Sequence, residues 1–329
     1  MSKRAHFIVF LLLFSFFSGL SAQSVKQLKK KATKENIPWI SFKWVGDSIG
    51  NRYFDKAYIN IPLQIENLPY QFDAQFDLGA FATIIYGKSI THYASFSPNL
   101  KESRDTLRIK GKKFPLYKNL TLHLDKVKFP NLTVVKLPGF GKEIPLDSVK
   151  TKTVKHIGTI GVDLCANKTL VIDYPNQKIA ILDEIPGSLL TKTEFLPAKF
   201  NKDDRVMIPF TIGDKTEYLM FDTGSSAFPL ITFPKYAELI TDSKEPVTDS
   251  LGISSWGSVH QMYKKKMNKK MYLGKNQVKN EYVYYSDKAA SSQKFFDDNG
   301  IFGFTGNVLF LDKILVIDFK NKKFGVIQK

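Results

Sequence analysis

The chain of 329 residues contains two stretches of the form Asp-x-Gly, FDLGAF at residues 76–81 and FDTGSS at residues 221–226. Their aspartates, Asp77 and Asp222, are 145 residues apart (222 minus 77). Two carboxyl groups held together cannot both ionise cheaply, so one can act as a general base while the other donates a proton. Asp and Gly are also favoured turn residues, and for Asp77 taken alone a simple turn remains an alternative.

A repeat supports the pairing of the two stretches. The same shift of 145 residues places residues 158–182 on residues 303–327 without a gap, with identities at Gly158/Gly303, Gly161/Gly306, Leu164/Leu309, Asp173/Asp318 and Asn176/Asn321. A duplicated pattern of this length predicts two halves built on one plan. The repeated Asp173 and Asp318 each lie between an expected strand and a turn, so we interpret them as turn-capping residues.

Both aspartates follow expected β-hairpins. Residues 70–76 alternate apolar and polar side chains and run directly into Asp77, and residues 59–65 are their expected partner strand. In the second half, residues 206–212 and 218–221 repeat this order before Asp222.

Doubled Asp-x-Gly loops with doubled downstream glycines resemble those of the aspartic peptidases of the pepsin and retropepsin type. The resemblance covers both halves, from about Ile61 onward. It implies an all-β fold of two pseudo-symmetric acid-protease β-barrel lobes with the active-site cleft between them. It also implies an exported, bacterial-type aspartic endopeptidase, in which Asp77 and Asp222 activate a water to hydrolyse a peptide or protein substrate without a cofactor or metal.

The resemblance assigns supporting roles as well. Loop support is expected from Gly79, Ala80, Thr223, Gly224 and Ser225, and from Gly161 and Gly306, against which the loops would pack. The shift of 145 residues also relates Gly111 to Trp256, both at expected hairpin tips where the family has a flap. Trp256 is therefore a candidate substrate contact, although a tryptophan in a strand is more often part of the core.

The first loop departs from the family pattern. Leu78 occupies the position where the family has Thr or Ser, whose hydroxyl ties one loop to the other, whereas Thr223 keeps that hydroxyl. The alternative function is therefore a catalytically impaired protein that binds peptides or proteins in the same cleft. Because Ser225 offers a hydroxyl to Asp222 and Ala80 offers none to Asp77, we expect Asp77 to be the more readily protonated aspartate.

The N-terminus is typical of a signal peptide. Lys3 and Arg4 precede an apolar run at residues 7–17 and a small-residue exit at residues 18–22. This pattern predicts a periplasmic or secreted protein after cleavage near Ala22. We expect a signal peptide at 1–22 and lobes at 23–187 and 188–329, connected near residues 184–194. No later apolar run approaches the roughly 20 residues of a spanning helix, so no transmembrane segment is expected.

Charge and cysteine content restrict the partners. The formal charge of +17 becomes +15 once the two basic residues of the signal peptide are lost. Lys-rich runs at residues 26–34 and 264–270 accompany no nucleic-acid motif, so we interpret them as solvated basic faces and keep a weak attraction to anionic surfaces as an alternative. Cys165 is the sole cysteine and is expected in the core. The five histidines lack metal-ligand spacing.

Overall fold

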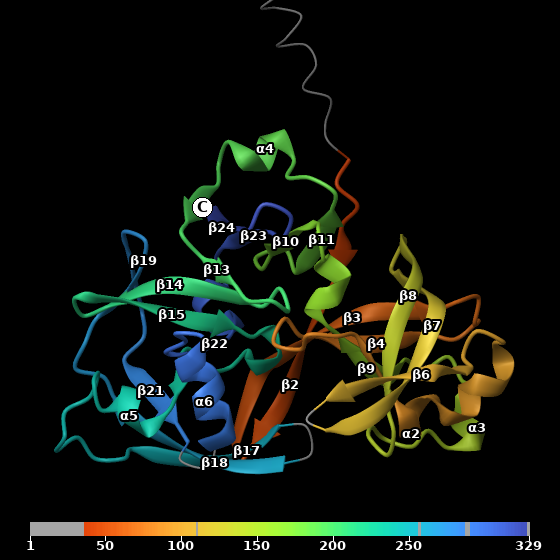
Figure 1. The fold of residues 1–329 in the computed structure, drawn as a ribbon, viewed down its shortest axis with the longest axis horizontal. Helices are drawn as coiled ribbons and strands as arrows, with labels where there is room; N and C mark the ends of the chain where they lie inside the picture. The colour runs from red at the N-terminus through yellow and green to blue at the C-terminus, as the bar shows by residue number, and fades with distance from the viewer. Residues whose placement is uncertain (1–35, 110, 256–257, 287–289, 328–329) are drawn as a thin grey trace, which may run out of the picture. The chain divides into compact units, whose positions relative to one another are not determined.

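The computed structural model describes residues 36–109, 111–255, 258–286 and 290–327. The chain from Pro38 onward forms one compact unit, in which nearly every element is a β-strand (Figure 1). The predicted signal peptide lies outside the described residues. Within them, no helix has the length and apolarity that a membrane crossing needs.

The first lobe is built on one twisted sheet with the strand order β2-β3-β4-β9-β5-β8-β7-β6. Its strands are β2 (Lys43–Ile49), β3 (Arg52–Ile65), β4 (Phe72–Phe76), β5 (Ile84–Tyr86), β6 (Glu102–Ile109), β7 (Lys112–Leu124), β8 (Val127–Leu137) and β9 (Lys155–Ile160). Its helical turns are α2 (Gly87–Ile90), η1 (Thr91–Phe96), α3 (Leu146–Val149) and η2 (Val162–Cys165).

The second lobe has a sheet of the order β17-β18-β21-β16-β22-β15-β14-β19-β20, with β13 paired to β14. Its strands are β13 (Lys199–Phe200), β14 (Val206–Ile212), β15 (Lys215–Phe221), β16 (Ile231–Thr232), β17 (Asp249–Ser255), β18 (Ser258–Lys266), β19 (Met271–Leu273), β20 (Asn276–Val278), β21 (Tyr282–Tyr285) and β22 (Gly303–Thr305). Its helices are η3 (Thr223–Ser225), α5 (Pro234–Ala237), α6 (Ala290–Asp298) and η4 (Asn307–Phe310).

A third sheet joins the two lobes in the order β1-β11-β10-β23-β24-β12. Its strands are β1 (Ile40–Ser41), β10 (Thr169–Asp173), β11 (Lys178–Leu182), β12 (Glu194–Leu196), β23 (Ile314–Asp318) and β24 (Lys323–Ile327), and α4 (Gly187–Leu190) precedes β12. At its centre β10 and β23 run antiparallel with Val171 opposite Val316. These two valines are 145 residues apart, so the pairing maps onto itself when the lobes are exchanged.

The strand pairing that leads to each Asp loop is the same in both lobes. Strand β4 runs parallel to β9 with Phe76 opposite Ile160, and β15 runs parallel to β22 with Phe221 opposite Thr305. Phe221 and Thr305 each lie 145 residues after their counterparts Phe76 and Ile160. The predicted all-β fold of two pseudo-symmetric acid-protease lobes is therefore confirmed.

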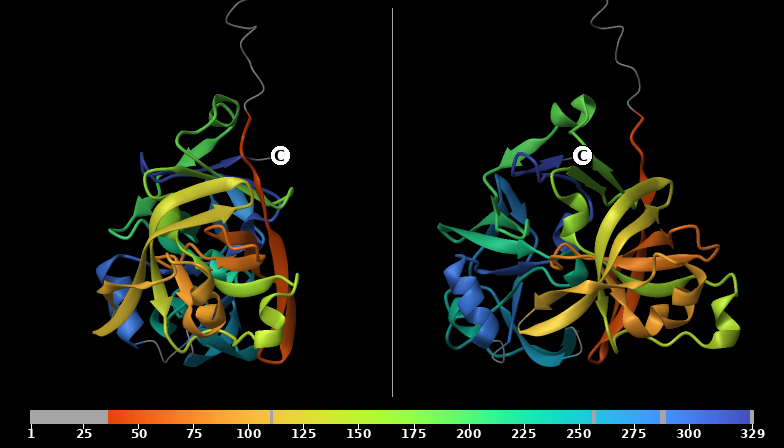
Figure 2. Two further views of the ribbon diagram at one scale, coloured as in Figure 1. Left: turned by 90° about the vertical axis from the view of Figure 1, so that its right-hand side faces the viewer. Right: turned by 45° about the vertical axis from the view of Figure 1, so that its right-hand side comes forward.

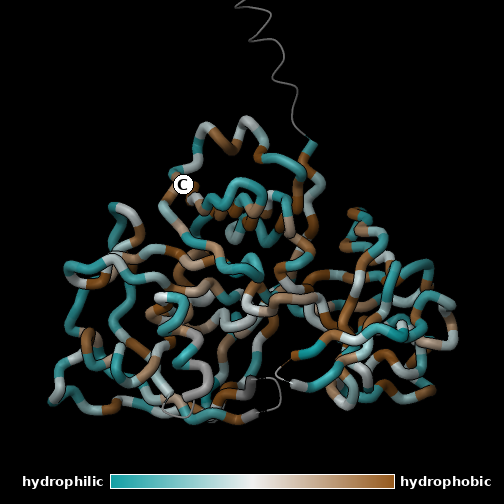
Figure 3. The backbone as a smooth tube through the Cα atoms, in the orientation of Figure 1, coloured by the Kyte–Doolittle hydropathy of each residue, from teal (hydrophilic) through white to brown (hydrophobic). Residues whose placement is uncertain are grey.

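Alternating side chains explain why these segments form strands with one buried face. In β4, Phe72 and Phe76 are buried while Asp73 and Gln75 are only half-buried, and Figure 3 shows the same alternation of hydropathy along many strands. Cys165 lies in the core as expected, where burial raises the pKa of its thiol. A free thiol so placed is a packing group.

The turns after β10 and β23 also match their prediction. Asp173 accepts hydrogen bonds from the backbone and side chain of Asn176, and Asp318 accepts the same pair from Asn321. Both aspartates thus cap turns, as expected from their place in the repeat.

The β2–β3 hairpin is a feature of the first lobe that reaches the second. Arg52 forms an ion pair with Asp249 of β17 at 2.6 Å, and the ring of Phe54 packs against Phe228 with 5.6 Å between centroids. Figure 2 shows β2 running from the joining sheet toward the second-lobe hairpin. The lobes are therefore held together at this hairpin as well as at the joining sheet.

Candidate active site

Each aspartate follows directly on a buried strand. The backbone N–H of Asp77 donates to the carbonyl of Ile160 at 3.0 Å, and that of Asp222 donates to the carbonyl of Thr305 at 2.9 Å. Because β9 and β22 are equivalent strands, the same backbone contact sets the start of both loops.

The two loops meet face to face. The Asp77 and Asp222 side chains hydrogen-bond to each other. A Cβ added to Gly79 would lie 2.7 Å from Cγ of Asp222, and one added to Gly224 would lie 2.7 Å from Cγ of Asp77. Each glycine therefore leaves the space that the opposite carboxyl occupies, and a side chain at either position would displace it.

Backbone N–H groups hold both carboxyls. Oδ1 of Asp77 accepts from Gly79 at 2.8 Å and from Ala80 at 3.1 Å, whereas Oδ1 of Asp222 accepts from Gly224 at 2.9 Å. Asp77 is 8% exposed. Donors of this kind favour the ionised form of a carboxyl, and the backbone of Ser225 acts on Asp222 as that of Ala80 acts on Asp77.

The pKa values of both aspartates are raised, that of Asp222 the more. Burial raises the pKa of Asp222 well above that of an ordinary aspartate, and the neighbouring charge of Asp77 raises it further. Burial also raises the pKa of Asp77, although hydrogen bonds from Asp222 and from the backbone of Gly79 and Ala80 partly offset the increase. This direction is opposite to the expectation that Asp77 is the more readily protonated member.

The backbone acts on the two carboxyls in the same way. The backbone of Ser225 lowers the pKa of Asp222 as that of Ala80 lowers the pKa of Asp77. Among the described residues, the hydroxyl of Ser225 makes no hydrogen bond with Asp222, so the side-chain difference on which the expectation rested has no contact with the pair.

Only one of the two expected hydroxyl ties is present. Oγ1 of Thr223 donates to the carbonyl of Phe76 at 2.8 Å and accepts from the N–H of Leu78 at 2.9 Å. Leu78 is fully buried and joins the hydrophobic core. The first loop is thus tied by the second, while the equivalent tie in the other direction is replaced by apolar packing.

The downstream glycines lie beneath the loops. A Cβ on Gly161 would lie 2.5 Å from the backbone carbonyl of Ala82, and one on Gly306 would lie 1.9 Å from the carbonyl oxygen of Ser225. Both glycines allow strands β9 and β22 to approach the loop backbone. The structure thus brings together the predicted Asp pair and all seven predicted loop-support residues.

Of the two residues predicted at flap tips, only Gly111 belongs to the described residues. Gly111 follows β6 at a hairpin tip with φ +81°, which favours glycine. Trp256 lies outside the described residues, between β17 and β18. Within the described chain, no group of three or more metal-binding side chains is present.

Several supporting side chains were not predicted. Thr83 binds both oxygens of Asp163, through its N–H at 2.9 Å and its hydroxyl at 2.8 Å, and so braces the first loop. In the second lobe, Nδ2 of Asn307 donates to the carbonyl of Thr223 at 3.0 Å. Asp163 and Asn307 lie just beyond the repeated glycines, and that position was the only sequence signal for them.

Two lobes of like topology that meet at paired Asp-x-Gly loops define the bilobed acid-protease fold. No protein-family model and no curated protein matches the chain. Among solved structures, the chain is similar to the crystal structure of basic 7S globulin from soybean, at 12% identity over 89% of this chain and 95% of that chain, with a TM-score of 0.42. That likeness is loose, so the fold assignment rests on strand order and pairing.

Proposed function

We propose that the chain is an aspartic endopeptidase that hydrolyses peptide bonds in extended segments of peptides or proteins. One observation carries the proposal: the carboxyls of Asp77 and Asp222 hydrogen-bond to each other, each against the glycine of the opposite loop. Raised pKa values with a single shared proton are what this acid–base chemistry requires.

We assign the protonated role to Asp222, whose pKa burial raises well above that of an ordinary aspartate. Asp77 is then the ionised member and takes a proton from a water molecule between the carboxyls. The water oxygen then bonds to the carbonyl carbon of the substrate while Asp222 donates its proton to the carbonyl oxygen. The C–N bond breaks as the amine leaves with the proton that Asp77 accepted, and the carboxylic acid product returns a proton to the pair.

The second candidate function is peptide binding without catalysis. The observation that favours it is Leu78, because the loop pair is tied by the hydroxyl of Thr223 alone. A small displacement of the carboxyls weakens proton transfer strongly, since catalysis depends on their relative position. Binding in the same place would tolerate that displacement.

A cleavage experiment separates the two candidates. The wild-type chain should cleave a peptide library at some pH between about 3 and about 8, and Asp77→Asn and Asp222→Asn should each lower the rate by about 100-fold or more. Asp297→Asn, which alters a surface ion pair with Lys235, is the matched control and should leave the rate unchanged. Binding of peptides without any cleavage would favour the second candidate.

We further propose export, on the charged start and apolar run of residues 1–22. The lobes at 23–187 and 188–329 remain our proposed division. N-terminal sequencing of the protein recovered from outside the cytoplasm should begin near residue 23, and an uncleaved Met1 would contradict the proposal.

A further inference from the structure

One face of the first-lobe sheet points toward the second lobe. Nε2 of Gln75 in β4 donates to the carbonyl of Gly224 at 3.3 Å, across the lobe boundary. Side chains alternate along a strand, so Asp73 shares this face with Gln75, and Asn60 of β3 shares it as the cross-strand partner of Gln75. This face therefore continues from the catalytic loops along β3 and β4.

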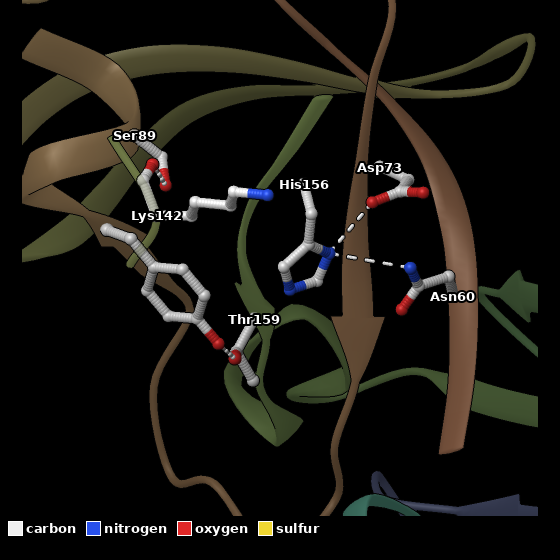
Figure 4. Close-up of polar contacts among 7 residues, drawn as sticks. Asn60, Asp73, Ser89, Lys142, His156 and Thr159 are labelled. Carbon is white, nitrogen blue, oxygen red and sulfur yellow. Dashed lines mark hydrogen bonds and ion pairs between the residues drawn. The ribbon is translucent and has the colours of Figure 1, made fainter. Parts of the chain in front are cut away.

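A polar cluster occupies that face. Nδ1 of His156 contacts Oδ1 of Asp73 at 2.8 Å and lies 3.4 Å from Nδ2 of Asn60 (Figure 4). Asn60 is 8% exposed, and its Oδ1 is buried without a hydrogen-bond partner. Among the described residues, Oδ2 of Asp73 also has no hydrogen-bond partner. Two oxygen acceptors thus lack a hydrogen-bond partner, one of them buried.

The equivalent face of the second lobe is apolar and covered. A shift of 145 residues places Met220, Tyr218 and Ile301 where the first lobe has Gln75, Asp73 and His156. Met220 and Ile301 are buried beneath Phe296 of α6, whose ring packs on Phe304 at 4.5 Å between centroids. The second-lobe face is therefore filled by the chain itself.

The first-lobe face stays accessible. The His156 and Asp73 side chains are 39% and 27% exposed, whereas Ile301, at the position of His156, is 0% exposed and Tyr218, at that of Asp73, is half-buried. Unpaired buried acceptors cost free energy, about 1–3 kcal/mol for each group, unless a ligand supplies a donor. The asymmetry between the lobes points to a binding role for this face.

The charge of the cluster identifies the ligand class. After burial, the charges of Asp47 and Asp73 are what raise the pKa of Tyr58, so both carboxylates lie close to that ring. Lys43 of β2, the cross-strand partner of Asn60, and Lys142 are opposing cations, and Figure 4 shows the amine of Lys142 directed toward His156 from an exposed loop. An arginine guanidinium offers five donors in a planar fork, which suits one carboxylate oxygen beside one amide oxygen.

We propose that Asn60 and Asp73 form a subsite for a basic side chain, arginine above all, of a bound peptide. The proposal rests on the proposed function of the same site, because it requires a peptide lying along the lobe boundary. Asp73 precedes Asp77 by four residues, about 13 Å along a strand. A peptide that runs along β4 advances at the same rate, so we expect its arginine about four residues from the scissile bond.

The test measures binding rather than cleavage. The probes are peptides in which a hydroxyl-bearing isostere replaces the scissile amide, with arginine or norleucine scanned through five positions on either side. Wild type should bind the arginine peptide about 10-fold more tightly at one position, which is the scale of one charge-assisted hydrogen bond. Asp73→Asn should remove that preference, Asn60→Leu should lower it, and Lys142→Ala should increase it.

A matched control lies in the second lobe. Tyr218→Phe alters the position equivalent to Asp73 and should leave the preference unchanged. An arginine preference below about 2-fold at every position, or an undiminished preference in Asp73→Asn, would overturn the proposal. Peptide cleavage without an arginine preference would contradict the subsite but not the proposed hydrolysis. An arginine preference without cleavage would contradict the proposed hydrolysis but not the subsite. Failure to bind any of the peptides would contradict both.

Discussion

The hydroxyl of Thr223 offers a direct test of how the two loops are held together. Thr223→Val keeps the shape of the side chain but removes the bonds to the carbonyl of Phe76 and the N–H of Leu78. All three residues are fully buried, so water cannot replace the lost partner. Each orphaned buried group costs about 1–3 kcal/mol, which gives about 2–6 kcal/mol for the two together.

The assay is urea denaturation at neutral pH, in which the dependence of the unfolding free energy on urea concentration is fitted separately for each variant. The midpoint should fall for Thr223→Val while the slope stays the same, because the surface exposed on unfolding does not change. Thr223→Ser is the control, since it keeps the hydroxyl and loses only a methyl group, a loss of about 1 kcal/mol. A Thr223→Val protein within about 0.5 kcal/mol of Thr223→Ser would refute the assigned tie.

Two further predictions concern the carboxyl pair. A carboxyl whose pKa is raised by folding stabilises the fold while it is protonated and destabilises it once ionised, so Asp222→Asn should be more stable than wild type at neutral pH. Equilibrium unfolding should show this gain shrink as pH falls and vanish below about 4, the unfolded pKa; a gain largest in acid would contradict it. Gly79→Ala should abolish peptide cleavage, whereas Gly252→Ala, with its nearest neighbour at 3.7 Å, should not.

The repeat made the fold predictable. A shift of 145 residues relates Asp77 to Asp222 and Gly161 to Gly306, and each pair performs the same packing task in its lobe. Alternation before Asp77 was also sufficient to place β4, because a half-buried strand must bury every second side chain.

Contacts between segments that are distant in the sequence are not marked by any repeat or alternation in the sequence. The approach of Phe54 to Phe228 joins residues 174 positions apart (228 minus 54), and nothing local to either segment indicates it. The balance of charge between the two aspartates was not predictable for a related reason, since both carboxyls accept from backbone N–H groups such as those of Gly79 and Gly224. A sequence shows which hydroxyls exist, but backbone direction appears only when the loop is folded.

The pairing of β10 with β23 has a consequence for how the chain can be divided. Because Val171 faces Val316, each half carries a strand that is complementary to its own counterpart, as at an isologous dimer interface. Two polypeptides produced by a cut between α4 and β12 would therefore each keep one strand of this pair. We expect the two fragments to associate and complement each other, and not to fold as two independent domains.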